Sequence, residues 1–189
     1  GLNALDLLKN LLFMQTGREE FDRLTGIWKE MVHTIEKTKK GEKPLRFLRY
    51  FVLAHYPDAR KNRKPLTEDD LYEWLSQQQD EIGITKDPIG YAKKLLEAAR
   101  LYQRHVATPG KNLNHIYQYS ARARQHLIIM LATEGLGAEE IDEVERQLER
   151  LFVGFVLAKE PTKALDVIFA NAAPALCQFI QKTPPSPQR

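Results

Sequence analysis

The stretch Phe21–Ile35, FDRLTGIWKEMVHTI, decides the fold class of this chain. Its large apolar residues alternate spacings of three and four: Phe21, Leu24, Trp28, Met31 and Ile35. Because an α-helix turns once every 3.6 residues, these side chains share one face and form a seam that faces another helix. The helix is predicted over residues 18–40, and Gly41 after a lysine-rich end is a typical stop.

The same spacing returns in the second half of the chain. A second seam is formed by Ile141, Val144, Leu148, Leu151 and Phe155, with acidic residues in the first turn of its helix. We expect both seams to be buried, since apolar stripes of this kind face a core.

Helical patterns also fill the segments outside the two seams. Leu2–Gln15 is apolar on two sides and therefore needs partners on both. Helix starts are indicated by Pro44, by Thr67 with three acids after it, and by Asp87 followed by proline. A helix is expected from Asn112 or Asn114 to about residue 134. A last one is expected over 162–182, kinked or split at its internal proline.

No window of useful length alternates with period two, so no strand is predicted. The sequence therefore predicts an all-α fold, an irregular multi-helix bundle of about eight helices. We expect a single helical domain over residues 1–182, followed by a proline-rich, disordered tail over 183–189.

The composition is that of an ordinary globular protein. The chain has 189 residues, of which 43% are hydrophobic and 28% charged, which excludes a wholly disordered chain. Its uninterrupted apolar runs are too short to span a bilayer, so no membrane partner is expected. One cysteine, Cys177, forms no internal disulfide and favours a reducing cytoplasm. The net charge of +3 permits contact with nucleic acid without demanding it.

The chain begins at Gly1, and helical sequence follows almost at once. This pattern predicts a fragment whose N-terminal portion is missing. A short native terminus that has been trimmed explains the same observation.

Metal and nucleotide motifs are absent from the sequence. The histidines His33, His55, His105, His115 and His126 are scattered without ligand spacing, and neither phosphate-binding glycine motif occurs. The acidic clusters fall in first turns of helices, where carboxylates are favoured by exposed N–H groups. We therefore expect no metal, no cofactor and no catalytic residue in this chain.

Two groups of basic residues are the candidate contacts to DNA phosphates. The first is the loop with Arg60, Lys61, Arg63 and Lys64, and the second is the pair Arg122 and Arg124. Cations in a loop neutralise phosphates and make affinity salt-dependent. Ordinary solvation of a polar loop explains the first group equally well.

The opening stretch Leu2–Phe13 reads LNALDLLKNLLF. It resembles the L-x-x-x-D-L-[IL]-K-N-x-[IL]-F segment of the "domain of unknown function 262" family, the GmrS/GmrD-type restriction proteins with a ParB/sulfiredoxin-like N-terminal module. The resemblance continues less specifically through the Trp28 helix, Phe47–Phe51, Leu66–Trp74, Leu101-Tyr102 and Leu148–Phe169.

In that family an α/β module with a D-G-Q-Q-R motif precedes this segment and is associated with nucleotide-dependent DNA cleavage. In many members an HNH-type nuclease module follows it. Since this sequence has neither motif, the resemblance implies a helical connector whose partner is the missing N-terminal module. Asp6, Lys9 and Asn10 match the motif beside that junction, where they either line the site of the missing module or cap and pack the junction.

Two functions from different classes follow from these observations. The first is a non-catalytic helical scaffold of a modification-dependent restriction nuclease in phage defence, which orients catalytic modules and touches DNA. The parent protein would be a nucleotide-dependent endonuclease. The second is a helical protein–protein interaction domain without a nucleic-acid role, favoured by the doubly apolar first helix.

Overall fold

The computed structural model describes residues 3–38, 41–61 and 64–182, and it confirms an all-α fold. Within these residues the chain forms nine α-helices, two 3-10 turns and one small β-ribbon. The helices are α1 (Ala4–Met14), α2 (Phe21–Glu36), α3 (Pro44–His55), α4 (Leu71–Gln78), α5 (Pro88–Ala107), α6 (Lys111–Tyr119), α7 (His126–Leu131), α8 (Ala138–Leu157) and α9 (Leu165–Lys182). The 3-10 turns are η1 (Arg18–Glu20) and η2 (Thr162–Ala164).

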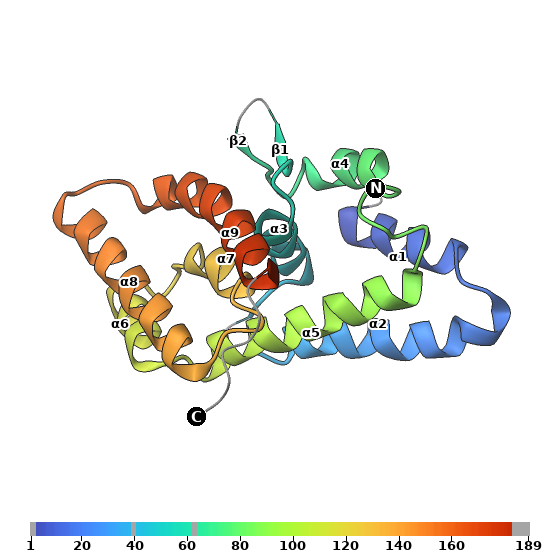
Figure 1. Ribbon diagram of the computed structural model, residues 1–189, viewed down its shortest axis with the longest axis horizontal. Helices are drawn as coiled ribbons and strands as arrows, with labels where there is room; N and C mark the ends of the chain where they lie inside the picture. Colours follow the sequence, from blue (N-terminus) through green and yellow to red (C-terminus); the bar gives the residue numbers. More distant parts are fainter. Residues whose placement is uncertain (1–2, 39–40, 62–63, 183–189) are drawn as a thin grey trace.

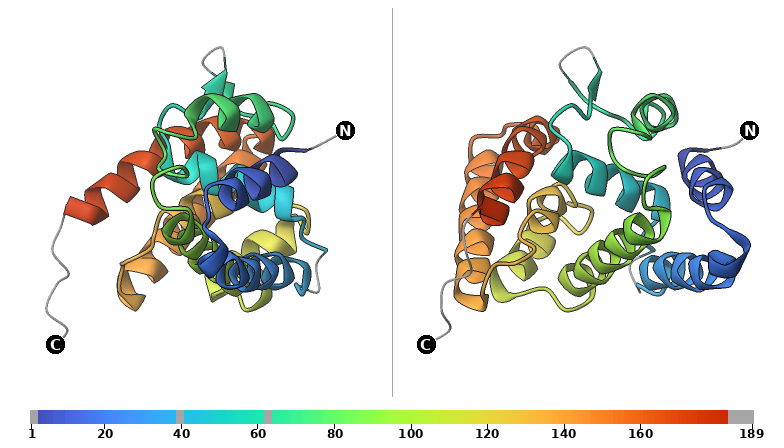
Figure 2. Two further views of the ribbon diagram at one scale, coloured as in Figure 1. Left: turned by 90° about the vertical axis from the view of Figure 1, so that its right-hand side faces the viewer. Right: turned by 45° about the vertical axis from the view of Figure 1, so that its right-hand side comes forward.

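Helix α3 lies at the centre of the molecule. It contacts α1, α2, α5, α7 and α9, and its stretch from Phe47 to Ala54 is buried except for Arg49. On one side α2 and α5 run side by side, with α1 and α4 above them (Figures 1 and 2). On the other side α8 packs on α6, while α9 packs on α3 and α7.

Two predicted helix starts are found where the sequence places them, and the third is displaced, because α4 begins at Leu71, four residues after the predicted cap Thr67. Helix α3 begins at Pro44, and α5 begins at Pro88 with the Asp87 carboxylate accepting from the Gly90 N–H at 2.7 Å. Before α4 the Thr67 and Asp70 side chains bond to each other and to each other's backbone N–H groups. These contacts satisfy N–H groups that a helix end leaves free.

The first seam is buried except for Phe21, and the second seam is buried only in part. Leu24, Trp28, Met31 and Ile35 are buried on α2, which packs on α5, whereas Phe21 stays 47% exposed. On α8 the prediction is confirmed only in part: Leu148 is buried, Ile141, Val144 and Phe155 are partly buried against the core, and Leu151 is 37% exposed. The face that α8 turns inward is Glu145, Leu148 and Phe152.

Two further expectations are corrected. The helix predicted over 112–134 is two helices, because the chain leaves α6 after Tyr119 and re-enters a helix at His126. The basic loop contains an antiparallel ribbon of β1 (Arg60–Lys61) and β2 (Lys64–Pro65), although no strand was expected. Buried Ala59 and Leu66 lie at its base, joined by a Leu66 N–H bond of 3.2 Å to the Ala59 carbonyl.

Helix α9 continues through Pro174, so the predicted split does not occur. Residues 162–182 reach the length and mean hydropathy, 1.2, of a membrane span. Leu165, Phe169 and Ala173 are nevertheless buried on this helix, which packs on α3 and α7. A core helix passes the same test of length and composition, so this is weak evidence for a span. The predicted tail, 183–189, lies outside the described residues.

Candidate functional site

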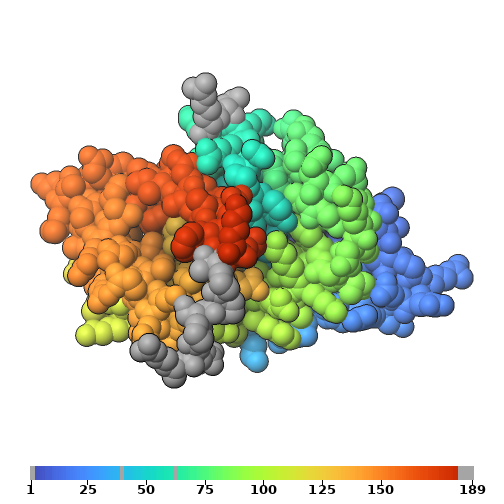
Figure 3. Space-filling view, viewed as in Figure 1, coloured from blue at the N-terminus to red at the C-terminus, as the bar shows by residue number. Residues whose placement is uncertain are grey.

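A groove of about 640 Å³ lies between the β-ribbon and the start of α9. Lys61 and Lys64 line it from the ribbon, Lys163 from η2, and Arg49 and Asp166 from α3 and α9. In the space-filling view the ribbon segment adjoins the start of α9 on the same face (Figure 3). The groove thus gathers cations from parts of the chain that lie about a hundred residues apart in sequence.

The cations in and beside this groove differ in how far neighbouring carboxylates already neutralise their charge. Lys61 Nζ lies 3.0 Å from Glu73 and 3.2 Å from Asp70, and the hydrogen bond to Glu73 raises the Lys61 pKa. Arg60, Lys64 and Lys163 are exposed, and among the described residues none of the three has a carboxylate within ion-pair distance. Arg63, the fourth predicted contact, lies outside the described residues.

Arg49 lines the groove and hydrogen-bonds to two segments beside it. Its Nε donates to the Leu66 carbonyl at 2.6 Å, and its Nη2 donates to Asp166 Oδ2 at 3.0 Å. Asp166 Oδ1 is buried and has no hydrogen-bond partner among the described residues. Arg49 therefore ties the base of the ribbon to α9 and is occupied by protein groups.

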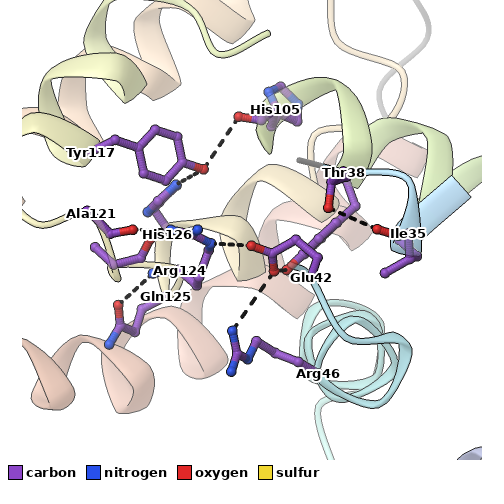
Figure 4. Close-up of polar contacts among 12 residues, drawn as sticks. Ile35, Thr38, Glu42, Arg46, His105, Tyr117, Ala121, Arg124, Gln125 and His126 are labelled. Carbon is purple, nitrogen blue, oxygen red and sulfur yellow. Dashed lines mark hydrogen bonds and ion pairs between the residues drawn. The ribbon is translucent and has the colours of Figure 1, made fainter. Parts of the chain in front are cut away.

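Arg124 has a different position from the one expected of a phosphate contact. Its side chain is 8% exposed, and its Nε donates to Glu42 Oε1 at 2.6 Å (Figure 4). Nη1 donates to the carbonyls of Ala121 and Ala123. The prediction that Arg124 contacts DNA is therefore wrong, because a buried guanidinium bonded to these protein groups cannot reach a phosphate. Arg122 is exposed in the same loop and does not line the groove.

The Glu42–Arg124 pair belongs to a buried polar network. Tyr102 Oη donates to Glu42 Oε2 at 2.6 Å. Burial, and next the negative charge of Glu42, raise the Tyr102 pKa far above its ordinary value. Glu42 follows α2 and Arg124 precedes α7, so the pair joins segments that are 82 residues apart. With side chains 1% and 8% exposed, the pair is a structural junction and not an open site.

A second polar group adjoins this network (Figure 4). His126 Nε2 lies 3.1 Å from Tyr117 Oη, which donates to the His105 carbonyl at 3.4 Å. On the other side of His105, Nδ1 lies 3.7 Å from Glu145 Oε1. The residue types are those of acid–base chemistry, but His105 and Glu145 are 6% and 3% exposed, which keeps substrates away.

The three residues that match the family motif, Asp6, Lys9 and Asn10, lie in two different settings. Asp6 caps α1, because the Asn3 N–H donates to Asp6 Oδ2 at 3.3 Å while Asn3 accepts from the Leu5 and Asp6 N–H groups. This supports the capping interpretation for Asp6. Lys9 and Asn10 instead line a pocket of about 360 Å³ between α1 and α2.

Sequence reasoning missed one more polar cluster, around His55. Burial, and next the charge of Lys94, lower the His55 pKa to about 4. Lys94 Nζ lies 5.6 Å from the centre of the Phe51 ring, and burial lowers its own pKa. Burial raises the pKa of the nearby Cys177 thiol, which disfavours the reactive thiolate. The single signal in the sequence is a histidine within the apolar run of α3.

No group of three or more His, Cys, Asp or Glu side chains is placed to hold a metal ion in the part of the chain that the structure describes. Comparison with known proteins finds no family model that matches the chain, and no similar curated protein or solved structure. The geometry of the groove and of the α1–α2 pocket is therefore the basis for a function.

Proposed function

We propose that this chain is a non-catalytic helical scaffold of a modification-dependent restriction protein, and that it contacts the phosphates of duplex DNA through the β-ribbon. The observation that carries the DNA contact is that Lys64 of the ribbon and Lys163 of η2, both exposed, line one groove. The restriction context rests on the resemblance of the opening segment.

The register of the ribbon supports an anionic partner. Lys61 is paired directly with Lys64 across the two strands, so their side chains lie on the same face. Like charges opposite each other are unfavourable. Asp70 and Glu73 offset the charge of Lys61, but Lys64 has no such partner in the described residues. A phosphate in the groove would neutralise Lys64, and Lys163 lies on the facing wall.

The scaffold part of the proposal is supported by the way the two sides of the molecule are joined. Central α3 contacts helices on both sides, and the buried Glu42–Arg124 pair links the segment after α2 to the segment before α7. A buried ion pair demands defined geometry, because either charge left alone is costly. Such a body can hold attached modules in a fixed relative orientation.

The test of DNA contact separates charge from fold. Changing Arg60, Lys61, Arg63 and Lys64 together to Ala should weaken duplex binding and flatten its salt dependence, by a slope of roughly 0.9 per lost phosphate contact. The melting temperature should barely change, since exposed charges contribute little to stability. A more specific test is the double variant Lys64→Ala with Lys163→Ala, because both lysines line the groove.

The matched control for that pair is Lys86→Ala with Lys93→Ala, which removes the same charge from exposed positions outside the groove. We expect the control to keep most of the affinity. Equal loss in the two double variants would show that only net charge matters, and would overturn the ribbon as the contact surface.

A second candidate function is a protein–protein interaction domain. It is favoured by the C-terminal half of α8, where Leu151, Val156 and Leu157 are 37%, 43% and 77% exposed. Isolated exposed apolar residues such as Leu151 are ordinary, so the surface that favours a partner is the last turn of α8, where Val156 and Leu157 are neighbours. Leu157→Asp should then abolish association with the attached modules and leave duplex affinity unchanged, whereas the ribbon variants should do the reverse.

A further inference from the structure

The pocket between α1 and α2 lies apart from the ribbon groove and shares no lining residue with it. Its volume of about 360 Å³ is within the range of about 300–1,000 Å³ that small-ligand sites have. Helix α1 contributes Lys9, Asn10 and Phe13 to its wall. Helix α2 contributes Phe21, Thr25, Trp28 and Lys29.

Aromatic rings form the apolar part of this pocket. Phe13 and Phe21 meet edge to face, with ring centres 5.0 Å apart at 78°. Trp28 is only 7% exposed, whereas Phe21 is 47% exposed although its position in the seam predicts burial. A large aromatic face open to solvent beside a cavity offers a surface on which a flat ring can stack.

The charges at the pocket are positive only. Lys9 Nζ lies 5.9 Å from the centre of the Phe13 ring, and Lys29 is exposed on the facing helix. No carboxylate lines the pocket, and in the described residues neither lysine has an ion-pair partner. Of the acids near these residues in sequence, Glu20 pairs with Arg23 and Glu30 pairs with Arg100, while Asp22 beside Phe21 is exposed and does not line the pocket.

We propose that the α1–α2 pocket binds one nucleotide unit, an unpaired base together with its phosphate. The base stacks on the exposed face of Phe21, and Lys9 and Lys29 neutralise the phosphate. Asn10 has an amide that can both donate to and accept from the edge of the base. The proposal goes beyond duplex contact at the ribbon and stands without it. A free mononucleotide and a base within a single strand share this chemistry.

The experiment uses the whole chain and two probes, adenosine monophosphate and a short single strand of deoxyadenylate, with affinities measured by calorimetry and fluorescence anisotropy. Phe21→Ala should weaken binding about tenfold, because one base–aromatic stack is worth that much or more. The matched control is Phe179→Ala on α9, a phenylalanine that is 66% exposed and outside the pocket. It should leave the affinity unchanged.

A second variant, Asn10→Asp, keeps the size of the side chain and adds a negative charge at the pocket. We expect it to weaken binding of both probes, more at low salt than at high salt, while the melting temperature stays the same. It keeps the test sharp if Phe21→Ala should disturb the packing of Phe13.

Binding of the monophosphate that Phe21→Ala weakens would support a free nucleotide as the ligand. Binding of the single strand alone, with the same sensitivity, would support a base within a strand. The proposal is overturned if neither probe binds at millimolar concentration. It is also overturned if Phe21→Ala and Phe179→Ala behave alike while Asn10→Asp changes nothing.

Discussion

Helices α2 and α8 are both long and amphipathic, but the molecule holds them in different ways. Helix α2 packs on α5 through Leu24, Trp28, Met31 and Ile35, so apolar side chains make the contact. Helix α8 packs on α6, and its buried face includes a carboxylate, Glu145. The apolar contact of α2 is continuous over three turns, whereas the contact of α8 combines Leu148 and Phe152 with polar pairs between helices.

Two polar pairs join the middle of α8 to neighbouring helices. His115 on α6 lies 2.6 Å from Glu149, and His105 on α5 lies 3.7 Å from Glu145. The approach at Gly110 is so close that a Cβ there would lie 2.0 Å from Glu145 Oε2. Beyond Glu149, Phe152 is buried and Phe155 is partly buried against the core, whereas Leu151, Val156 and Leu157 are exposed. A long apolar stripe is therefore not by itself evidence that all of its residues contact a core.

The largest expected effect tests the α2 side of this comparison. Trp28→Ala should lower the free energy of unfolding by about 3–5 kcal/mol, the cost of truncating a large buried aromatic side chain. Urea denaturation would measure it. An unchanged midpoint would show that the α2–α5 contact does not limit stability and would remove the contrast with α8.

The junction between the two regions should be of similar importance. Arg124→Met keeps the length of the side chain but removes the closer cation of the buried Glu42 carboxylate, which keeps only Arg46 at 4.0 Å, so we expect a loss of up to about 3–5 kcal/mol. The double variant Arg124→Met with Glu42→Gln should recover part of that loss, because no net charge remains buried. Equal stability of the single variant and the native chain would contradict a structural role for the pair.

Much of the fold could be predicted from local signals. The caps at Asn3 and Asp87 and the proline at position 44 depend only on neighbouring residues, and α2 has its helical period within one segment. The buried face of α8 could not be predicted in this way. Glu145 is turned inward because His105, 40 residues earlier, lies opposite it. A count of apolar residues along α8 favours a stripe turned toward Val144 and Leu151, which shares Leu148 with the buried face.

The candidate site shows the same division. The basic run at Arg60–Lys64 was evident in the sequence, but Lys163 joins it only through the fold. Arg124 looked like an exposed cation because its partner, Glu42, is 82 residues away. Lys9 and Asn10 were identified by resemblance, whereas the aromatic rings beside them depend on how α1 packs against α2.

Lowering the pH should reduce the free energy of unfolding through protonation of His55. Its pKa in the folded state, about 4, lies below the ordinary value of 6.5, so folding favours the neutral ring. This contribution is complete above pH 6.5 and is lost as the pH falls from about 6.5 to about 4, with a total of about 3 kcal/mol. Urea titrations at a series of pH values should show a steeper loss for the native chain than for His55→Gln. Parallel curves would contradict it.

The smallest expected change in stability tests which face of α8 is buried. Leu151 and Phe152 are neighbours, but Leu151 is 37% exposed and Phe152 is 3% exposed. Leu151→Ala should change the free energy of unfolding by no more than about 0.5 kcal/mol, as is usual for surface positions. Phe152→Ala should cost several times more, because it opens a cavity in the contact of α8 with the body. Measured together by urea denaturation, the two variants test the register of the helix, since rotating it to bury the predicted seam would reverse their order. If Leu151→Ala were the more damaging, α8 would be held like α2, and the contrast between the two helices would disappear.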